Sequence, residues 1–104
     1  DLIATGRLRQ HGIYYFVPGM LRYFDTEAVV SLIAPRPLLT LTGDRDGGSP
    51  ISGLRTINKF VAGIYRLYGK EDCFRGIVYP RVGHKYTVKM WRETLSWLHR
   101  RLKE

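Results

Sequence analysis

The chain has 104 residues, and 17 Lys and Arg residues against 9 Asp and Glu residues give it a formal net charge of +8 at neutral pH. Hydrophobic residues make up 44% and charged residues 25%, which excludes a disordered tail, and no apolar run approaches the roughly 20 residues that a membrane span needs. A single cysteine, Cys73, excludes an internal disulfide framework and a multi-cysteine metal site, and we expect no targeting segment because no leader-like run follows Asp1.

The chain begins with a segment that shows little regular pattern. Residues 1–24 are predicted as an irregular lead-in, in which the dipeptide Pro18-Gly19 favours a turn. The sequence Asp-Thr-Glu at 25–27 is typical of a helix start, because it offers a side-chain cap and an acidic first turn. Pro35 is predicted to end that helix.

The middle of the chain predicts a strand, a loop and a helix. The nearly continuous apolar run at 37–42, which ends at Gly43, is typical of a strand buried on both faces of a parallel sheet. Residues 44–50 have the composition of a loop. Apolar residues spaced three or four apart predict an amphipathic helix over 53–68, with Gly69 as the residue that follows its C-terminus.

The last third of the chain repeats this pattern. Residues 74–79 predict a second strand that ends at Pro80, and the apolar periodicity of 88–102 predicts a final helix. Alternation of helices and strands indicates an α/β fold, with two parallel strands joined by a right-handed crossover and flanked by helices.

This arrangement is predicted to be incomplete by itself. A stable sheet generally needs three or more strands or a covering partner, and a parallel sheet needs both faces covered. We therefore interpret residues 1–104 as a single partial domain, whose helix-strand-helix-strand-helix part is 25–104. Either a missing N-terminal segment or oligomerisation would complete it.

The positive charge alone does not indicate a function. Most of the basic residues are spread along the sequence, and the one cluster is Arg100, Arg101 and Lys103, where cations also suit a helix C-terminus. A solvated surface is favoured over a nucleic-acid interface, which would need a concentrated basic patch.

Asp46 and His84 are the residues whose placement points to chemistry. Each follows the C-terminal end of a predicted strand, and ligands of open α/β sheets bind outside the carboxyl ends of strands. Strands that neighbour each other lie about 4.8 Å apart, so these loops could bring the carboxylate within reach of the imidazole. Such a pair forms two-thirds of a catalytic triad.

The sequence Gly-Asp-Arg-Asp at 43–46, followed by Pro50 and, after one crossover, by Gly83-His84, resembles the C-terminal part of the α/β-hydrolase family. The approach to the first strand, Ile-Ala-Pro-Arg-Pro-Leu-Leu at 33–39, is similar to the dienelactone hydrolase and acetyl xylan esterase branch. The resemblance extends from about His11 to the C-terminus. It implies that Asp46 is the catalytic acid and His84 the base of a serine esterase.

The nucleophile of that family is not found in these 104 residues. It lies in a G-x-S-x-G turn that precedes the acid in the chain, and the serine that precedes Asp46 here, Ser31, has no flanking glycines. Ser49 in Gly-Gly-Ser-Pro-Ile lacks the final glycine and follows the acid. Pro50 also removes the backbone N–H that an oxyanion hole takes from the residue after the nucleophile.

Each candidate residue also has a structural interpretation. Asp46 could be a turn residue of a glycine-rich loop, and Asp44 is a turn former and the second choice as the acid. His84 could be a loop residue without a catalytic role, while His11 and His99 are interpreted as structural or surface groups. The tryptophans and tyrosines are assigned to packing, and Cys73 to a small hydrophobic side chain that opens a strand.

The sequence therefore predicts the C-terminal part of a serine ester hydrolase, with Asp46 and His84 supplied and the nucleophile lacking, so that the chain by itself is inactive. Its expected partners are an ester substrate and the missing hydrolase segment, with no cofactor, metal or membrane. The alternative is a non-catalytic domain that self-associates through its sheet edges, and a basic nucleic-acid-binding module is the least favoured hypothesis. The cellular compartment stays open.

Overall fold

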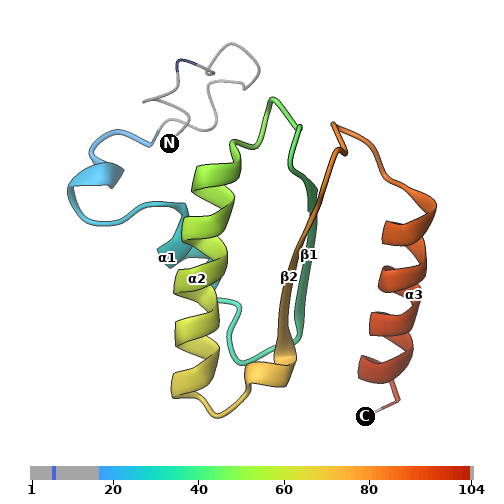
Figure 1. Cartoon of the computed structure of the whole chain (residues 1–104). Helices are drawn as coiled ribbons and strands as arrows, with labels where there is room; N and C mark the ends of the chain where they lie inside the picture. Colours follow the sequence, from blue (N-terminus) through green and yellow to red (C-terminus); the bar gives the residue numbers. More distant parts are fainter. Residues whose placement is uncertain (1–5, 7–16, 104) are drawn as a thin grey trace.

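The computed structural model describes Gly6 and residues 17–103, which form a small α/β domain with a two-stranded parallel sheet and three helices (Figure 1). The elements in chain order are a 3-10 turn (Met20–Arg22), α1 (Thr26–Ser31), β1 (Leu38–Gly43), α2 (Ile51–Leu67), a second 3-10 turn (Glu71–Cys73), β2 (Phe74–Tyr79) and α3 (Val88–Arg101). Both predicted strands and their parallel pairing are confirmed. None of the described helices is long and apolar enough to cross a membrane.

The ends of the elements follow local chemistry. The Asp25 carboxylate accepts a hydrogen bond from the Thr26 backbone N–H at 2.7 Å, which confirms the predicted start of α1. The helix ends at Ser31, earlier than the prediction, and several backbone hydrogen-bonded turns continue the chain to Pro35. Gly69 follows α2 with a φ of 62°, a conformation that glycine adopts readily.

The structure differs from the prediction at the start of α2 and at Cys73, and it describes only part of the expected lead-in. Helix α2 begins at Ile51, two residues before the expected start, with Pro50 as its N-cap. Cys73 is half-buried in the 3-10 turn before β2 rather than in the strand. Of the expected irregular lead-in, the described part contains the Pro18-Gly19 turn, and most of 1–16 lies outside the described residues.

The sheet separates α2 from α3, so that each helix covers one face (Figure 1). In the parallel register Leu38 pairs with Phe74 and Leu39 with Arg75, and successive pairs point to opposite faces. The Phe74 ring stacks on Tyr65 of α2, with ring centroids 5.4 Å apart. Arg75 points to the other face, where its Nε lies 3.3 Å from a carboxylate oxygen of Glu93 in α3.

The hydrophobic core of the described residues is small. Its buried members are Val61 and Tyr65 on α2, and Met90 and Trp97 on α3. Many other large apolar side chains stay exposed, and within the described residues each strand has one unpaired edge. A parallel sheet generally has both faces covered, and the expectation that further polypeptide completes this one stays a prediction.

Tyr65 links the core to the segment before β1, since its hydroxyl donates a hydrogen bond to the carbonyl oxygen of Arg36. Burial raises the pKa of this phenol above its ordinary value of about 10. A raised pKa means that the folded state holds the proton more tightly than the unfolded chain. The contribution to stability is therefore present below pH 10 and is lost as the pH rises through the folded-state pKa.

Tyr65→Phe is expected to lower the free energy of unfolding by about 1 kcal/mol at pH 7, because the buried hydrogen bond is lost. The variant should also lose less stability than the wild type between pH 9 and 11, as measured by urea unfolding at each pH. The matched control is Tyr68→Phe, at an exposed tyrosine just after α2. An alkaline profile that is identical in wild type and Tyr65→Phe would contradict the assignment.

Candidate active site

Asp46 lies in the loop that connects β1 to α2, and its side chain is held from two directions. One carboxylate oxygen, Oδ1, accepts a hydrogen bond from the Gly48 backbone N–H at 2.9 Å, and the other, Oδ2, lies 2.9 Å from Nδ1 of His84. The Asp46 side chain is only 10% exposed. These contacts fix the orientation of the carboxylate relative to the imidazole.

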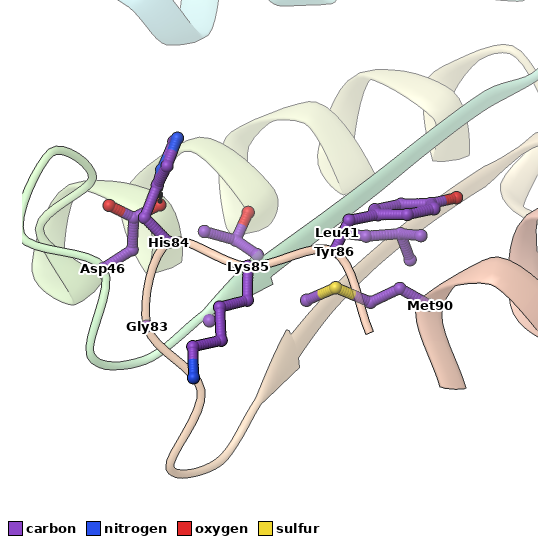
Figure 2. Close-up of a pocket in the computed structure, with 9 residues that line it drawn as sticks. Leu41, Asp46, Gly83, His84, Lys85, Tyr86 and Met90 are labelled. Atoms are coloured by element: carbon purple, nitrogen blue, oxygen red, sulfur yellow. Dashed lines mark hydrogen bonds and ion pairs between the residues drawn. The ribbon is translucent and has the colours of Figure 1, made fainter. Parts of the chain in front are cut away.

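His84 lies in the loop that follows β2. Gly43 and Tyr79 pair at the carboxyl ends of β1 and β2, so the loop that carries His84 begins beside the end of β1. Its side chain is 94% exposed, with the ring next to the Asp46 carboxylate (Figure 2). The structure thus brings together the two residues that the sequence singled out, although they are 38 positions apart.

The contact between Asp46 and His84 suits proton transfer at Nε2, the ring nitrogen that does not contact the carboxylate. A carboxylate only accepts hydrogen bonds, so the contact with Nδ1 favours the tautomer in which Nδ1 carries the proton. The neutral ring then presents the lone pair of Nε2 to its surroundings, and Nε2 is accessible because the side chain is exposed. Such a histidine can act as a general base, while the carboxylate stabilises the imidazolium that forms.

Backbone contacts hold the two loops together. The N–H groups of Asp44 and Arg45 donate to the carbonyl oxygens of Tyr79 and Val82, at 3.0 and 2.9 Å. The loop before His84 crosses directly over Gly43, where an added Cβ would lie 2.1 Å from the Val82 carbonyl oxygen. Gly43 therefore allows the close approach that sets the position of His84.

Gly43→Ala is expected to lower the free energy of unfolding by about 1–3 kcal/mol, because the added methyl forces the backbone at Val82 to move. The control is Gly63→Ala in the middle of α2, where an added Cβ meets nothing within 4 Å, and which should raise stability by about 0.5–1 kcal/mol. Urea unfolding of both variants gives the comparison. Equal effects of the two substitutions would contradict the role of Gly43.

A hollow of about 270 Å³ opens beside the pair, next to His84 (Figure 2). Its lining combines strand residues with the loop and the start of α3: Leu41, Thr42, Gly43, Asp46, Gly83, His84, Lys85, Tyr86 and Met90. Sequence reasoning missed Lys85, Tyr86 and Met90 as site residues. Their nearness to His84 in the sequence was an available signal for Lys85 and Tyr86, whereas Met90 reaches the hollow only through the packing of α3.

The other candidate residues lie in different settings. Oδ1 of Asp44 is buried without a hydrogen-bond partner among the described residues, so His84 pairs with Asp46 rather than with the second-choice acid. Ser31 is the last residue of α1, and its hydroxyl donates to the Ala28 carbonyl oxygen at 2.6 Å. The Ser49 backbone N–H donates to the Asp46 carbonyl oxygen.

His99 is exposed on α3, and His11 lies outside the described residues. Among the residues that the structure describes, no group of three or more His, Cys, Asp or Glu side chains is placed to hold a metal ion.

Comparison with known proteins gives one informative relative. The chain is 38% identical over 99 residues to a Bacillus subtilis (strain 168) protein named "Putative hydrolase YtaP", a match that covers 95% of this chain and 33% of that protein. No protein-family model matches the sequence, and no solved structure matches it. The chain therefore spans about a third of the curated relative that it matches, and over nearly its whole length it is related to a protein named as a hydrolase.

Proposed function

We propose that these residues are the acid–base part of a serine ester hydrolase of the α/β-hydrolase fold, in the dienelactone hydrolase and acetyl xylan esterase branch. The observation that carries the proposal is the 2.9 Å contact between Asp46 Oδ2 and His84 Nδ1 at the carboxyl ends of two adjacent parallel strands. The nucleophilic serine would come from hydrolase polypeptide outside these 104 residues, because they contain no G-x-S-x-G sequence.

The proposed reaction is hydrolysis of an ester in two steps. Nε2 of His84 takes the proton of the serine hydroxyl as its oxygen attacks the ester carbonyl, and the protonated ring then gives that proton to the departing alcohol. In the second step His84 removes a proton from water as the water oxygen attacks the acyl-enzyme. The bond to the serine oxygen then breaks, the acid leaves, and the protonated ring returns its proton to the serine oxygen. Throughout, the Asp46 carboxylate holds the ring and stabilises its charged form.

The match to the Bacillus subtilis relative supports this proposal. Two thirds of that protein lie outside the match, which leaves ample polypeptide for a nucleophile and for the strands that would complete the sheet. The many exposed apolar side chains of this chain offer the corresponding contact surface. The resemblance supplies the ester as the substrate class, and the hollow beside His84 would lie next to the reacting carbonyl.

A second candidate function is a non-catalytic domain that self-associates, and the unpaired strand edges in the described residues favour it. Self-association predicts a sedimentation mass that rises above 12.0 kDa with concentration. A monomer at all concentrations would contradict it.

The test of the proposed function is a chimera in which the matched third of the Bacillus subtilis relative is replaced by these 104 residues. We expect the chimera to hydrolyse an activated acetyl ester such as p-nitrophenyl acetate, and a fluorophosphonate, which reacts with activated serines, should abolish the turnover. The control is the relative with its own matched segment. A folded chimera without turnover beside an active relative would contradict the proposal.

A further inference from the structure

The hollow beside His84 has a polar end and an apolar end (Figure 2). Asp46 and His84 lie at the polar end, and the side chains of Leu41, Tyr86 and Met90 gather at the other. The apolar end thus combines an aliphatic, an aromatic and a thioether side chain. Aromatic rings pair well with one another, and a methionine sulfur also contacts a ring favourably. This end of the hollow therefore suits a flat, apolar ring.

Tyr86 is held in place although it is 60% exposed. Its hydroxyl hydrogen-bonds to Oγ1 of Thr94 on α3, and because that oxygen donates its own proton to the Met90 carbonyl oxygen at 3.1 Å, the tyrosine is the donor. The ring meets that of Trp91 edge to face, with centroids 6.4 Å apart. These two contacts fix the orientation of the ring, so a ligand that stacks on it does not have to order it first.

Met90 is fixed at the same end of the hollow. It is 2% exposed, and its sulfur accepts a hydrogen bond from the Thr87 backbone N–H at 3.4 Å. In return, the Thr87 hydroxyl accepts a hydrogen bond from the Met90 backbone N–H at 3.3 Å and caps α3. The sulfur and the Tyr86 ring are therefore both anchored to the first turns of one helix.

The proposed reaction brings the alcohol portion of the ester to this hollow. Nε2 of His84 gives its proton to the departing alcohol oxygen, which must then lie within hydrogen-bond reach of the ring, about 2.6–3.2 Å. Tyr86 follows His84 by two residues and lines the same hollow. A group attached to the departing oxygen can therefore extend from His84 to the apolar end.

We propose that Tyr86 is a specificity-determining residue that stacks on an aromatic ring in the alcohol portion of the ester, with Leu41 and Met90 in contact with the same ring. The inference rests on the proposed function and adds a substrate class to it, namely esters of aromatic alcohols. Stacking on Tyr86 is present both before and during the reaction. It therefore lowers KM for such esters and leaves kcat nearly unchanged.

The experiment compares hydrolysis of benzyl acetate and cyclohexylmethyl acetate by the chimera. Both are esters of primary alcohols that carry a six-membered ring, and only the benzyl ring is aromatic. We expect kcat/KM to be about 3- to 10-fold higher for benzyl acetate, through KM, which is the range that an aromatic pair provides. Tyr86→Leu should remove this preference, whereas Tyr86→Phe keeps the ring and should retain it. The matched control is Tyr68→Leu, at a tyrosine after α2 that is 58% exposed, and it should also retain the preference.

A binding measurement separates this inference from the proposed catalysis. Benzyl alcohol bound to the chimera should show nuclear Overhauser contacts with the ring protons of Tyr86, whether or not the chimera hydrolyses esters. Far-UV circular dichroism establishes whether Tyr86→Leu keeps its helices, and if that variant is unfolded, the contacts in the wild-type chimera decide.

Three kinds of result would overturn the proposal. The first is an equal kcat/KM for the two esters, and the second is the absence of contacts between benzyl alcohol and Tyr86. The third is a pattern of variants in which folded Tyr86→Leu keeps the preference, or in which Tyr86→Phe or Tyr68→Leu loses it. A chimera that binds benzyl alcohol at Tyr86 without hydrolysing any ester would support the inference and contradict the proposed function.

Discussion

His84→Ala is expected to lower kcat of the chimera for the activated ester by about 10⁴-fold or more, with little change in KM. The substitution removes the imidazole that is proposed to take the serine proton, and the remaining rate then comes from substrate binding and oxyanion stabilisation. The measurement is steady-state hydrolysis of p-nitrophenyl acetate by the purified variants. A loss confined to kcat is the signature of a group that acts in the transition state rather than in substrate binding.

Unfolding measurements on the same variants separate a loss of catalysis from a loss of folding. His84 is 94% exposed, so its removal should change the free energy of unfolding by no more than about 0.5 kcal/mol. His99→Ala, at an exposed histidine on α3, should leave both rate and stability unchanged. A His84→Ala chimera that stays folded and keeps more than a tenth of the rate would contradict the assignment.

Asp46→Asn is expected to lower kcat by about 10³–10⁴-fold, although it changes a single atom of the pair. The asparagine oxygen can still accept from the Gly48 N–H, but the amide NH₂ then faces Nδ1 of His84 and donates instead of accepting. The ring is driven to the tautomer that carries its proton on Nε2, where it cannot accept the serine proton. The loss should appear in kcat with the fold intact.

Asp44→Asn is the matched control for this prediction. Asp44 lies two residues before Asp46 in the same loop, and the structure shows no hydrogen bond between its Oδ1 and any described residue. We expect its kcat to stay within about threefold of the wild type. If Asp44→Asn fell as far as Asp46→Asn, the two carboxylates would have to share the role of the acid, and the assignment would be wrong.

Much of the fold could be predicted because its signals are local. The second strand has the predicted bounds, since an apolar run that meets a proline leaves little choice of end. The carboxylate side-chain cap at Asp25 and the glycine after α2 likewise act within one turn of chain. Parallel pairing followed from the intervening helix, because two strands joined by such a crossover run in the same direction.

The site could be predicted only in outline. Placement after two neighbouring strands pointed to Asp46 and His84, but the choice between Asp44 and Asp46 depends on which carboxylate the loop turns toward the histidine. The role of Gly43 comes from a contact with a loop almost forty residues later, for which the sequence holds no local sign. Tertiary packing determines both the carboxylate that faces His84 and the close approach at Gly43.

The early end of α1 and the exposed apolar side chains of α3 illustrate the same limit. Periodicity predicts that α3 is amphipathic, yet it does not say that the sheet covers Met90 and Trp97 while Leu95 and Leu98 stay exposed. The expectation from the sequence that two parallel strands need further cover stays a prediction.

The most direct test of the central claim is the intact mass after exposure to a fluorophosphonate probe. The claim is that Asp46 and His84 activate a serine that lies outside these 104 residues. The account predicts that the isolated 12.0 kDa chain stays unmodified, that the chimera gains one adduct on a serine outside the 104 residues, and that His84→Ala suppresses this adduct. An adduct on the isolated chain, at Ser49 or any other serine, or labelling of the chimera that is indifferent to His84→Ala, would contradict it.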